Sequence, residues 1–266
     1  MIPKPAHLGR HYGGQFEDET VARAYHTRPP YPAELFDILE KLMPPGPRSI
    51  LDVGCGTGDV ALGLRGRANR VDAVDPSGAM LRVARSRYRP DDPSLRWVKA
   101  RAETFRPDTY YSLIVAAESF HWMEWEEVLP WVSDALLFGA FLCFVSGREI
   151  APVPWSAELG RLIAQYSTNR EYRPYHLVSE LRDRELFLEV GRSSTTPVHC
   201  EQPIDSYIES FHTRNGLSRE RMTPAAAEAF DEALRRLILP HCPDGVVLGE
   251  TQATVVWGTP CCPTRG

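Results

Sequence analysis

The stretch Ile50–Gly58, with the sequence Ile-Leu-Asp-Val-Gly-Cys-Gly-Thr-Gly, decides the fold of this chain. An apolar run that contains one acid, Asp52, breaks into three glycines at alternate positions, Gly54, Gly56 and Gly58. This pattern predicts a buried strand that turns tightly into a helix. Glycine permits left-handed backbone angles and lets a ligand approach the main chain closely. A glycine-rich turn alone is weak evidence for a binding site, so the rest of the chain must support it.

The next apolar segment, Arg70–Asp75, ends in a second acid. In open α/β sheets an acid at the tip of the second strand, about twenty residues after the turn, holds the ribose hydroxyls of a nucleoside ligand. A dinucleotide site favours the spacing G-x-G-x-x-G, whereas the third glycine here comes one residue early. The sequence therefore predicts a nucleoside ligand on Asp75.

At these residues the chain resembles the class I S-adenosylmethionine-dependent methyltransferases, in particular the small-molecule branch that includes trans-aconitate-type and natural-product methyltransferases. The family motif, an acid-x-G-x-G-x-G turn with an acid closing the second strand, is matched by Asp52, the three glycines and Asp75. Four further stretches resemble the family in the right order: Tyr25-x-x-Arg28-Pro29-x-Tyr31-Pro32, Val74–Ser77 with Met80-Leu81, Ala102-Glu103 and Ala116–Trp122.

The resemblance implies an α/β fold, with a Rossmann-like, mostly parallel seven-stranded sheet, helices on both faces and a helical cap inserted after the fifth strand. The apolar runs 95–98, 111–117 and 140–145 are expected as strands three to five. We expect strands six and seven at 193–200 and 251–257, the last antiparallel. The predicted organisation is an N-terminal lid (1–31), a cofactor-binding core (32–147), a helical insertion that covers the substrate (148–192), the end of the core with the last two strands and the helices between them (193–260), and a loose tail (261–266).

The cofactor implied by the resemblance is S-adenosylmethionine, released as S-adenosylhomocysteine. Arg28 is expected to meet its carboxylate, Asp75 its ribose, and Ala102 and Glu103 its adenine. The other expected cofactor-binding residues are Asp52, Gly54, Gly56, Gly58, Pro76, Met80 and Ala117.

Residues that follow Ala117 should face the cofactor, because ligands of parallel sheets lie outside the carboxyl ends of the strands. We expect His121 to act as a base for a hydroxyl acceptor, since imidazole titrates near neutrality, and Tyr12 or Tyr25 to face the reacting methyl group. A structural role for His121 and a packing role for the aromatic residues are the alternatives. An amine acceptor would need only orientation, by Glu118 or Glu124. The expected substrate residues are Tyr12, Tyr25, Glu118, Phe120, His121 and Trp122.

The predicted function is methyl transfer to an oxygen or nitrogen of a small-molecule acceptor in specialised metabolism. One alternative is carboxyl methylation of a small acid, although no arginine is obviously placed beside the cluster 118–122 to hold an acceptor carboxylate. Another alternative, from a different class, is a regulator that binds S-adenosylmethionine without catalysis.

Composition and charge argue against several classes of ligand and partner. The formal net charge is −5 and the pI about 5.9, which gives no electrostatic support for a nucleic-acid ligand. No apolar run is long enough to span a bilayer and the N-terminus lacks a secretion signal, so we expect a cytoplasmic protein without a membrane partner. The cysteines form no C-x-x-C pair, and the adjacent pairs His199-Cys200 and His241-Cys242 lack zinc-site spacing, so no metal is expected.

Overall fold

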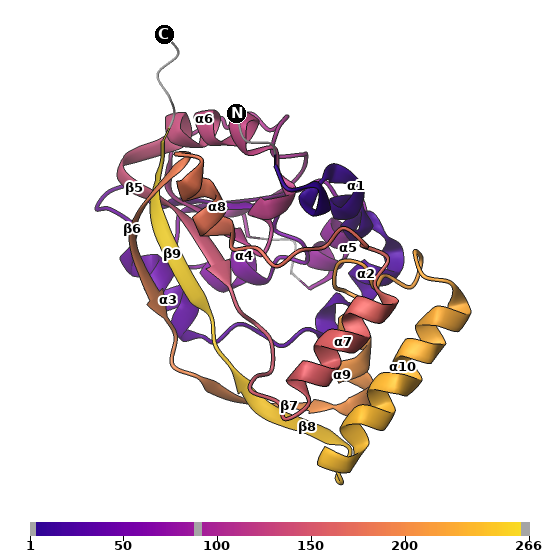
Figure 1. Ribbon diagram of the computed structural model, residues 1–266. Coiled ribbons are helices and arrows are strands. Elements are labelled where there is room, and N and C mark those ends of the chain that lie inside the picture. The colour runs from indigo at the N-terminus through magenta and orange to yellow at the C-terminus, as the bar shows by residue number, and fades with distance from the viewer. Residues whose placement is uncertain (1–3, 88–91, 262–266) are drawn as a thin grey trace.

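The computed structural model describes residues 4–87 and 92–261, and its centre is a seven-stranded sheet (Figure 1). The strand order is β3-β2-β1-β4-β5-β9-β6. Pairings among β3, β2, β1, β4 and β5 are parallel, whereas β9 runs antiparallel to both neighbours. The predicted Rossmann-like sheet is therefore confirmed. The bounds are β1 (Ser49–Val53), β2 (Arg70–Asp75), β3 (Leu95–Lys99), β4 (Tyr111–Ala117), β5 (Leu136–Ser146), β6 (Phe187–Ser194) and β9 (Thr254–Pro260).

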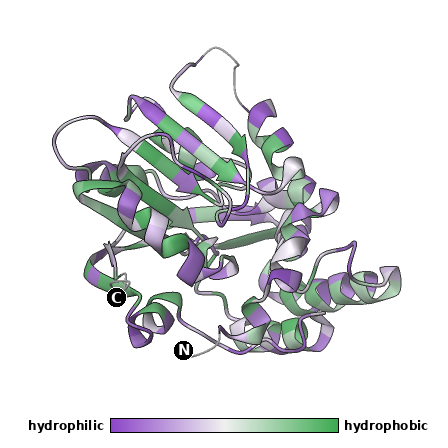
Figure 2. Cartoon of the chain, turned by 90° about the horizontal axis from the view of Figure 1, so that it is seen from above, coloured by the Kyte–Doolittle hydropathy of each residue, from purple (hydrophilic) through white to green (hydrophobic). Residues whose placement is uncertain are grey.

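Helices cover both faces of this sheet. Successive side chains of a strand point to opposite faces, so Ile50 and Leu51 of β1 belong to two different apolar cores. Figure 2 shows hydrophobic residues gathered along the central strands and mixed with hydrophilic ones on the surrounding helices. The helices on the Leu51 side are α6 (Trp125–Ala135) and α8 (Leu177–Asp183), and those on the Ile50 side are α3 (Glu34–Lys41), α4 (Asp59–Leu64) and α5 (Gly78–Ser86).

A second layer, which we call the cap, has an apolar core of its own built around Trp155, Phe211 and Phe230. Its longest helix begins with Thr223 as N-cap, whose Oγ1 accepts a hydrogen bond from the Ala226 amide at 3.2 Å. Figure 1 shows the cap elements gathered at the end of the molecule away from α6. They are α7 (Ser156–Tyr166), α9 (Ile204–Phe211), α10 (Pro224–Ile238), the short helix η5 (Leu239–His241) and an antiparallel pair of strands, β7 (Val198–Pro203) and β8 (Val246–Thr251).

The cap differs from the predicted insertion at 148–192. The strand expected at 193–200 is two strands, because β6 ends at Ser194 in the main sheet and β7 begins at Val198 in the cap. Phe187 on β6 and Leu181 on α8 are buried against the main sheet, so both elements belong to the core. The cap is instead completed by residues 198–250, which the sequence analysis assigned to the end of the core.

The N-terminal segment is a chain of short helical turns that lies against the sheet and the cap. Leu8 is buried in the core on the α6 side, and Val21 packs with Met80 of α5. Within the residues described, no helix is long and apolar enough to cross a membrane. Of the predicted tail at 261–266, all but Cys261 lies outside the described residues. The turns are η1 (Ala6–Leu8), α1 (Arg10–Gly13), η2 (Gly14–Glu17), α2 (Glu19–Ala24) and η3 (Tyr25–Thr27).

Candidate functional site

The strand order reverses between β1 and β4, and the carboxyl ends of these two strands meet there. Gly54 adopts φ +73°, and a Cβ at this position would lie 2.5 Å from Cβ of Ser119, just past β4. Ser119 in turn donates a hydrogen bond from Oγ to the Val53 carbonyl at 2.7 Å. Because Gly54 has no side chain, the residues that follow β1 and β4 can pack closely together. Open α/β sheets bind their ligands at this point.

The other two glycines of the turn, Gly56 and Gly58, have different structural roles. Gly58, at φ +82°, leaves room for Trp97, whose ring a Cβ would approach to 2.4 Å. Gly56, at φ +53°, meets no atom closer than Tyr25 at 3.9 Å and lines an open cavity. Gly56 thus presents bare backbone to a ligand, whereas Gly58 serves packing.

The first cavity encloses about 830 Å³, including space open to solvent. One wall consists of strand exits and the segments that follow them, and the other consists of Arg10, Gly13, Gly14, Phe16 and Glu17 from the N-terminal segment. The predicted residues that the structure brings together here are Tyr25, Gly54, Gly56, Asp75, Pro76, Met80, Ala102, Glu103, Ala117, Glu118 and Trp122.

Asp75 is the fixed acid of this cavity. Its Oδ1 accepts a hydrogen bond from the Ser77 amide and its Oδ2 one from the Gly56 amide, each at 2.8 Å. Burial raises the pKa of Asp75 to about 6, although the two backbone hydrogen bonds favour the ionised form. The carboxylate is thereby held in one orientation, and each oxygen keeps acceptor capacity for a ligand hydroxyl.

Asp52 lies beneath the cavity and does not line it. Its Oδ2 accepts a hydrogen bond from the Ala61 amide at 3.0 Å, in the first turns of α4. Its Oδ1 is buried without a hydrogen-bond partner among the described residues, and burial raises its pKa to about 8. The expected direct contact of Asp52 with the cofactor is therefore not what the structure shows; the side chain supports the turn instead.

A second cavity, of about 1,900 Å³ including open solvent, adjoins the first. Phe16, Glu118 and Trp122 line both, so they form the boundary between the two. The backbone of Glu118 is left-handed, at φ +50°, and its Oε1 accepts a hydrogen bond from the Gly147 amide at 2.9 Å. Burial raises the pKa of this carboxyl, while the Gly147 amide and the charge of Arg28 act in the opposite direction.

His121 lines the second cavity, with its ring 4.6 Å from that of Trp122. Burial is the main reason that its pKa falls to about 3, and the nearby charges of Lys4, Arg28 and His7 lower it further. The imidazole is neutral at physiological pH and does not titrate near neutrality, contrary to the sequence-based expectation. It remains able to accept a hydrogen bond from a bound molecule, although a pKa of about 3 makes it a weak base in the free protein.

Several predicted residues lie elsewhere. Tyr12 donates its hydroxyl hydrogen bond to Glu171 at 2.9 Å and lines neither cavity, so the structure does not bring it together with the other predicted site residues. Phe120 is fully buried in the main core against Phe144. Arg28 lines the second cavity rather than the first, where the cofactor carboxylate was expected. Glu124 lines neither.

Of the arginines in the second cavity, only Arg28 was among the predicted site residues. The expectation that no arginine is obviously placed beside the cluster 118–122 was wrong, because Arg28, Arg148 and Arg214 line the same cavity as His121. Arg148 follows β5, so the rule that ligands lie beyond strand ends could have found it. Arg214 lies after α9 and had no comparable signal in the sequence.

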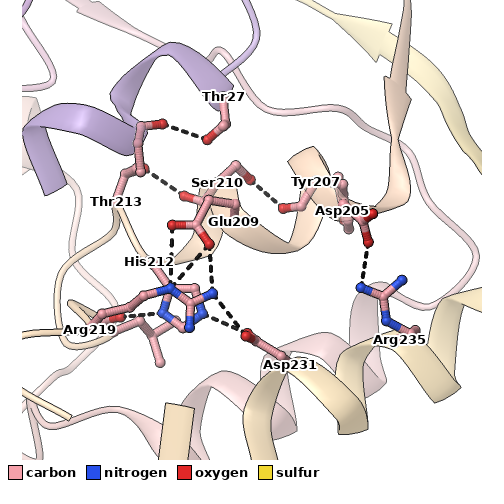
Figure 3. Close-up of polar contacts among 12 residues, drawn as sticks. Thr27, Asp205, Tyr207, Glu209, Ser210, His212, Thr213, Arg219, Asp231 and Arg235 are labelled. Carbon is pink, nitrogen blue, oxygen red and sulfur yellow. Dashed lines mark hydrogen bonds and ion pairs between the residues drawn. The ribbon is translucent and has the colours of Figure 1, made fainter. Parts of the chain in front are cut away.

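Segment 212–222, between α9 and α10, is fixed by the charged cluster drawn in Figure 3. His212 places Nδ1 2.7 Å from the Leu217 carbonyl and Nε2 2.6 Å from Oδ1 of Asp231. Arg219 donates to both Glu209 and Asp231, at 2.6 and 2.8 Å. The cluster ties the segment to the cap helices on both sides.

The same segment holds the N-terminal turns over the cavities. The Gly216 amide donates to Oε1 of the buried Gln15 at 2.8 Å, and Arg221 pairs with Asp18 at 2.9 Å. Asn215 donates to the carbonyl of residue 12 at 3.0 Å. Two parts of the chain about 200 residues apart thus form one cover.

Among residues 4–87 and 92–261, no group of three or more His, Cys, Asp or Glu residues is arranged to hold a metal ion.

Comparisons with known proteins agree with this geometry. A family model described as a methyltransferase domain matches residues 50–136. The chain is 29% identical over 197 residues to a "probable S-adenosylmethionine-dependent methyltransferase" of Saccharomyces cerevisiae, covering 71% of this chain and 63% of the yeast protein. It is 32% identical over 138 residues to an uncharacterised methyltransferase of Mycobacterium tuberculosis, covering 52% and 54% of the two chains. The chain thus spans less than two thirds of the length of these relatives. A solved structure of a type II methyltransferase candidate from Anaeromyxobacter dehalogenans superimposes with a TM-score of 0.55 at 25% identity, over 88% of this chain and 96% of that one.

Proposed function

We propose that this chain, which belongs to the class I S-adenosylmethionine-dependent methyltransferases, transfers a methyl group to an oxygen or nitrogen of a small-molecule acceptor in specialised metabolism. The observation that supports this most directly is the pair of adjoining cavities. One has the bare turn and the fixed acid suited to a nucleoside, and the other has room for a second molecule.

The residues of the first cavity fit S-adenosylmethionine. Asp75 would hold the ribose hydroxyls, Gly56 would admit the ligand to the backbone, and Ala102 with Met80 would offer apolar contact to the adenine. When bound, this group supplies a methyl activated by a sulfonium charge, which bonds to an acceptor lone pair while the carbon–sulfur electrons stay on sulfur.

The chain itself must orient the two molecules and exclude water, because such a displacement needs the reacting atoms about 3 Å apart and in line. Phe16 and Trp122, whose ring centroids are 5.7 Å apart, stand at the boundary of the two cavities. Their electron-rich faces suit a nearby cation. Residues 10–17 close the first cavity from the solvent side, which is the role we assign to the predicted lid.

The proposal is tested in two steps, with calorimetry on S-adenosylhomocysteine and a screen of pooled small molecules with isotopically labelled methyl donor. We expect binding to one site per chain and label in at least one acceptor. Binding without transfer to any acceptor would favour the non-catalytic regulator. No binding would contradict the assignment of the first cavity.

His121→Asn should lower turnover while leaving the affinity for S-adenosylhomocysteine unchanged, because His121 lines the second cavity and not the first. If the imidazole is the base for a hydroxyl acceptor, the loss in turnover is on the order of 10²- to 10⁴-fold. The pH profile of kcat/KM should show no inflection near 6.5 from this residue, since its pKa in the free protein is about 3. Steady-state kinetics with the acceptor found above measures both.

The control is His26→Asn, at an exposed histidine whose Nδ1 lies 2.8 Å from the Arg23 carbonyl and which lines neither cavity. Its kinetics should equal those of the unmodified protein. Unchanged turnover in His121→Asn would leave His121 a structural residue.

A further inference from the structure

The second cavity carries an excess of positive charge in a chain whose net charge is −5. Five arginines and two glutamates line it, and its two histidines, His7 and His121, have lowered pKa values because burial disfavours their charged forms. The cavity field is thus opposite in sign to the overall charge, which attracts anions. The arginines are Arg28, Arg148, Arg170, Arg173 and Arg214.

Arg28 is a fixed guanidinium without a carboxylate partner in the described residues. Its Nε donates to Oγ1 of Thr213 at 2.7 Å and its Nη2 to the Thr213 carbonyl at 2.6 Å. Its guanidinium carbon lies 4.6 Å from the centre of the Tyr25 ring, and Tyr25 lines the first cavity. Neutral oxygens and a ring hold this group in place near the junction, so it can also bond to the oxyanion of a ligand.

Arg214 is a further cation of this cavity, and it is less exposed than the acid that it pairs with. It pairs with Glu149 at 3.0 Å, but the Glu149 side chain is 65% exposed while that of Arg214 is 28% exposed. An ion pair with so exposed an acid contributes little, so a bound anion can replace it. Burial lowers the pKa of Arg214, which indicates that this guanidinium is incompletely compensated. Arg148 differs, because Asp59 at 2.8 Å and the Pro29 carbonyl at 2.9 Å already satisfy it.

We propose that the acceptor is an organic anion whose oxyanion group, a carboxylate or a phosphate, is held by Arg28 and Arg214. This inference rests on the proposed methyl transfer, and it names the class of acceptor that the same site takes. Planar guanidinium groups match both oxyanions in geometry, and two of them fix the orientation of the molecule that carries the anion. The rest of the acceptor would lie toward Glu118 and Trp122, where the two cavities meet.

The test measures binding of matched compounds to the protein loaded with S-adenosylhomocysteine, by calorimetry. Hydroxy acids are compared with their neutral amides, and phosphate monoesters with the corresponding alcohols. We expect members of one anionic class to bind at least about tenfold more tightly than their neutral partners, a difference of about 1.4 kcal/mol. The class that binds distinguishes a carboxylate from a phosphate. Neutral compounds that bind as tightly as the anions would overturn the proposal.

Arg28→Gln and Arg214→Gln should each weaken binding of the preferred anion by about tenfold to a hundredfold, as expected for a lost hydrogen bond to a charged group. Their affinity for neutral partners and for S-adenosylhomocysteine should stay unchanged. Arg28→Lys, which keeps the charge but loses the planar fork, covers the case in which Arg28→Gln fails to fold. The control is Arg161→Gln, at an arginine on α7 that pairs with Glu158 and lines neither cavity.

The outcomes separate this inference from the proposed function. If the unmodified protein does not bind S-adenosylhomocysteine, the proposed methyltransferase function is contradicted. Normal cofactor binding, together with anion binding that Arg28→Gln and Arg214→Gln leave intact, contradicts only the role of the two arginines.

Discussion

Asp75→Ala is expected to weaken the binding of S-adenosylhomocysteine by at least about 100-fold, or about 3 kcal/mol, since hydrogen bonds to charged groups contribute about 1.5–3 kcal/mol each. The carboxylate is already oriented by the Ser77 and Gly56 amides, so the ligand does not have to order it. The substitution removes both ribose acceptors together with the anchor of the glycine turn. Calorimetry at pH 7.5 measures the affinity.

Folding should be affected much less than binding. The two amides lose their acceptor, but the protein no longer buries a carboxylate whose pKa is raised to about 6, and these effects oppose each other. Denaturant unfolding of the free protein checks this. Equal affinity of Asp75→Ala and the unmodified protein would contradict the ribose assignment.

Asp72→Asn is the matched control on the same strand. Asp72 is buried at the other end of β2, where Arg70 and Arg96 both bond to it at 2.9 Å. Arg70 and Arg96 are partly exposed and both also pair with Asp108, so losing their bonds to Asp72 should cost about 1–3 kcal/mol of stability. The folded fraction of Asp72→Asn should nevertheless bind the ligand normally. Asp72 would then affect mainly the stability of the protein, and Asp75 mainly the binding of the ligand.

The parts of the site that the sequence predicts are those set by local pattern. The apolar runs of parallel strands are buried on both faces, and their carboxyl ends meet at one edge of the sheet. For that reason Gly56, Asp75 and Glu118 could be placed together before the structure was known, and the structure does bring them together. The glycine motif could not distinguish the ligand-facing Gly56 from Gly58, whose role depends on the distant Trp97.

The parts that the sequence did not predict depend on which distant segment a residue meets. Residues 193–200 alternate enough to predict one strand, but Ser193 pairs with Val255 in the main sheet whereas Cys200 pairs with Gly249 in the cap. Arg28 matches a family motif, yet Thr213 draws its guanidinium into the second cavity. Tyr12 likewise turns to Glu171. No local pattern encodes these long-range partners.

The free protein should lose stability as pH rises from 6.5 to 8, by ~1.5 kcal/mol, because of Asp52. The folded pKa of this buried acid, about 8, lies above its ordinary value of about 3.9 in the unfolded chain. Between these two values the folded protein holds a proton that the unfolded chain has lost. Raising the pH therefore favours unfolding until the folded acid has itself ionised.

Asp75 and His121 act mainly outside this window. Asp75, with a pKa of about 6, makes most of its contribution below pH 6.5 and in the same direction. His121, with a pKa lowered to about 3, opposes both acids between about 3 and 6.5, because the unfolded chain then binds the extra proton. The slope between pH 6.5 and 8 thus belongs chiefly to Asp52. Denaturant unfolding at constant ionic strength measures it.

Asp52→Asn should flatten this slope and make the protein more stable than the unmodified one at pH 8, since an amide can still accept the Ala61 hydrogen bond without a buried charge. Asp134→Asn, at an exposed acid, should keep the slope. The affinity of Asp52→Asn for S-adenosylhomocysteine should be unchanged, because Asp52 does not line the first cavity. A loss of affinity as large as that of Asp75→Ala would instead show that the acid of the glycine motif touches the ligand, as the family resemblance first implied.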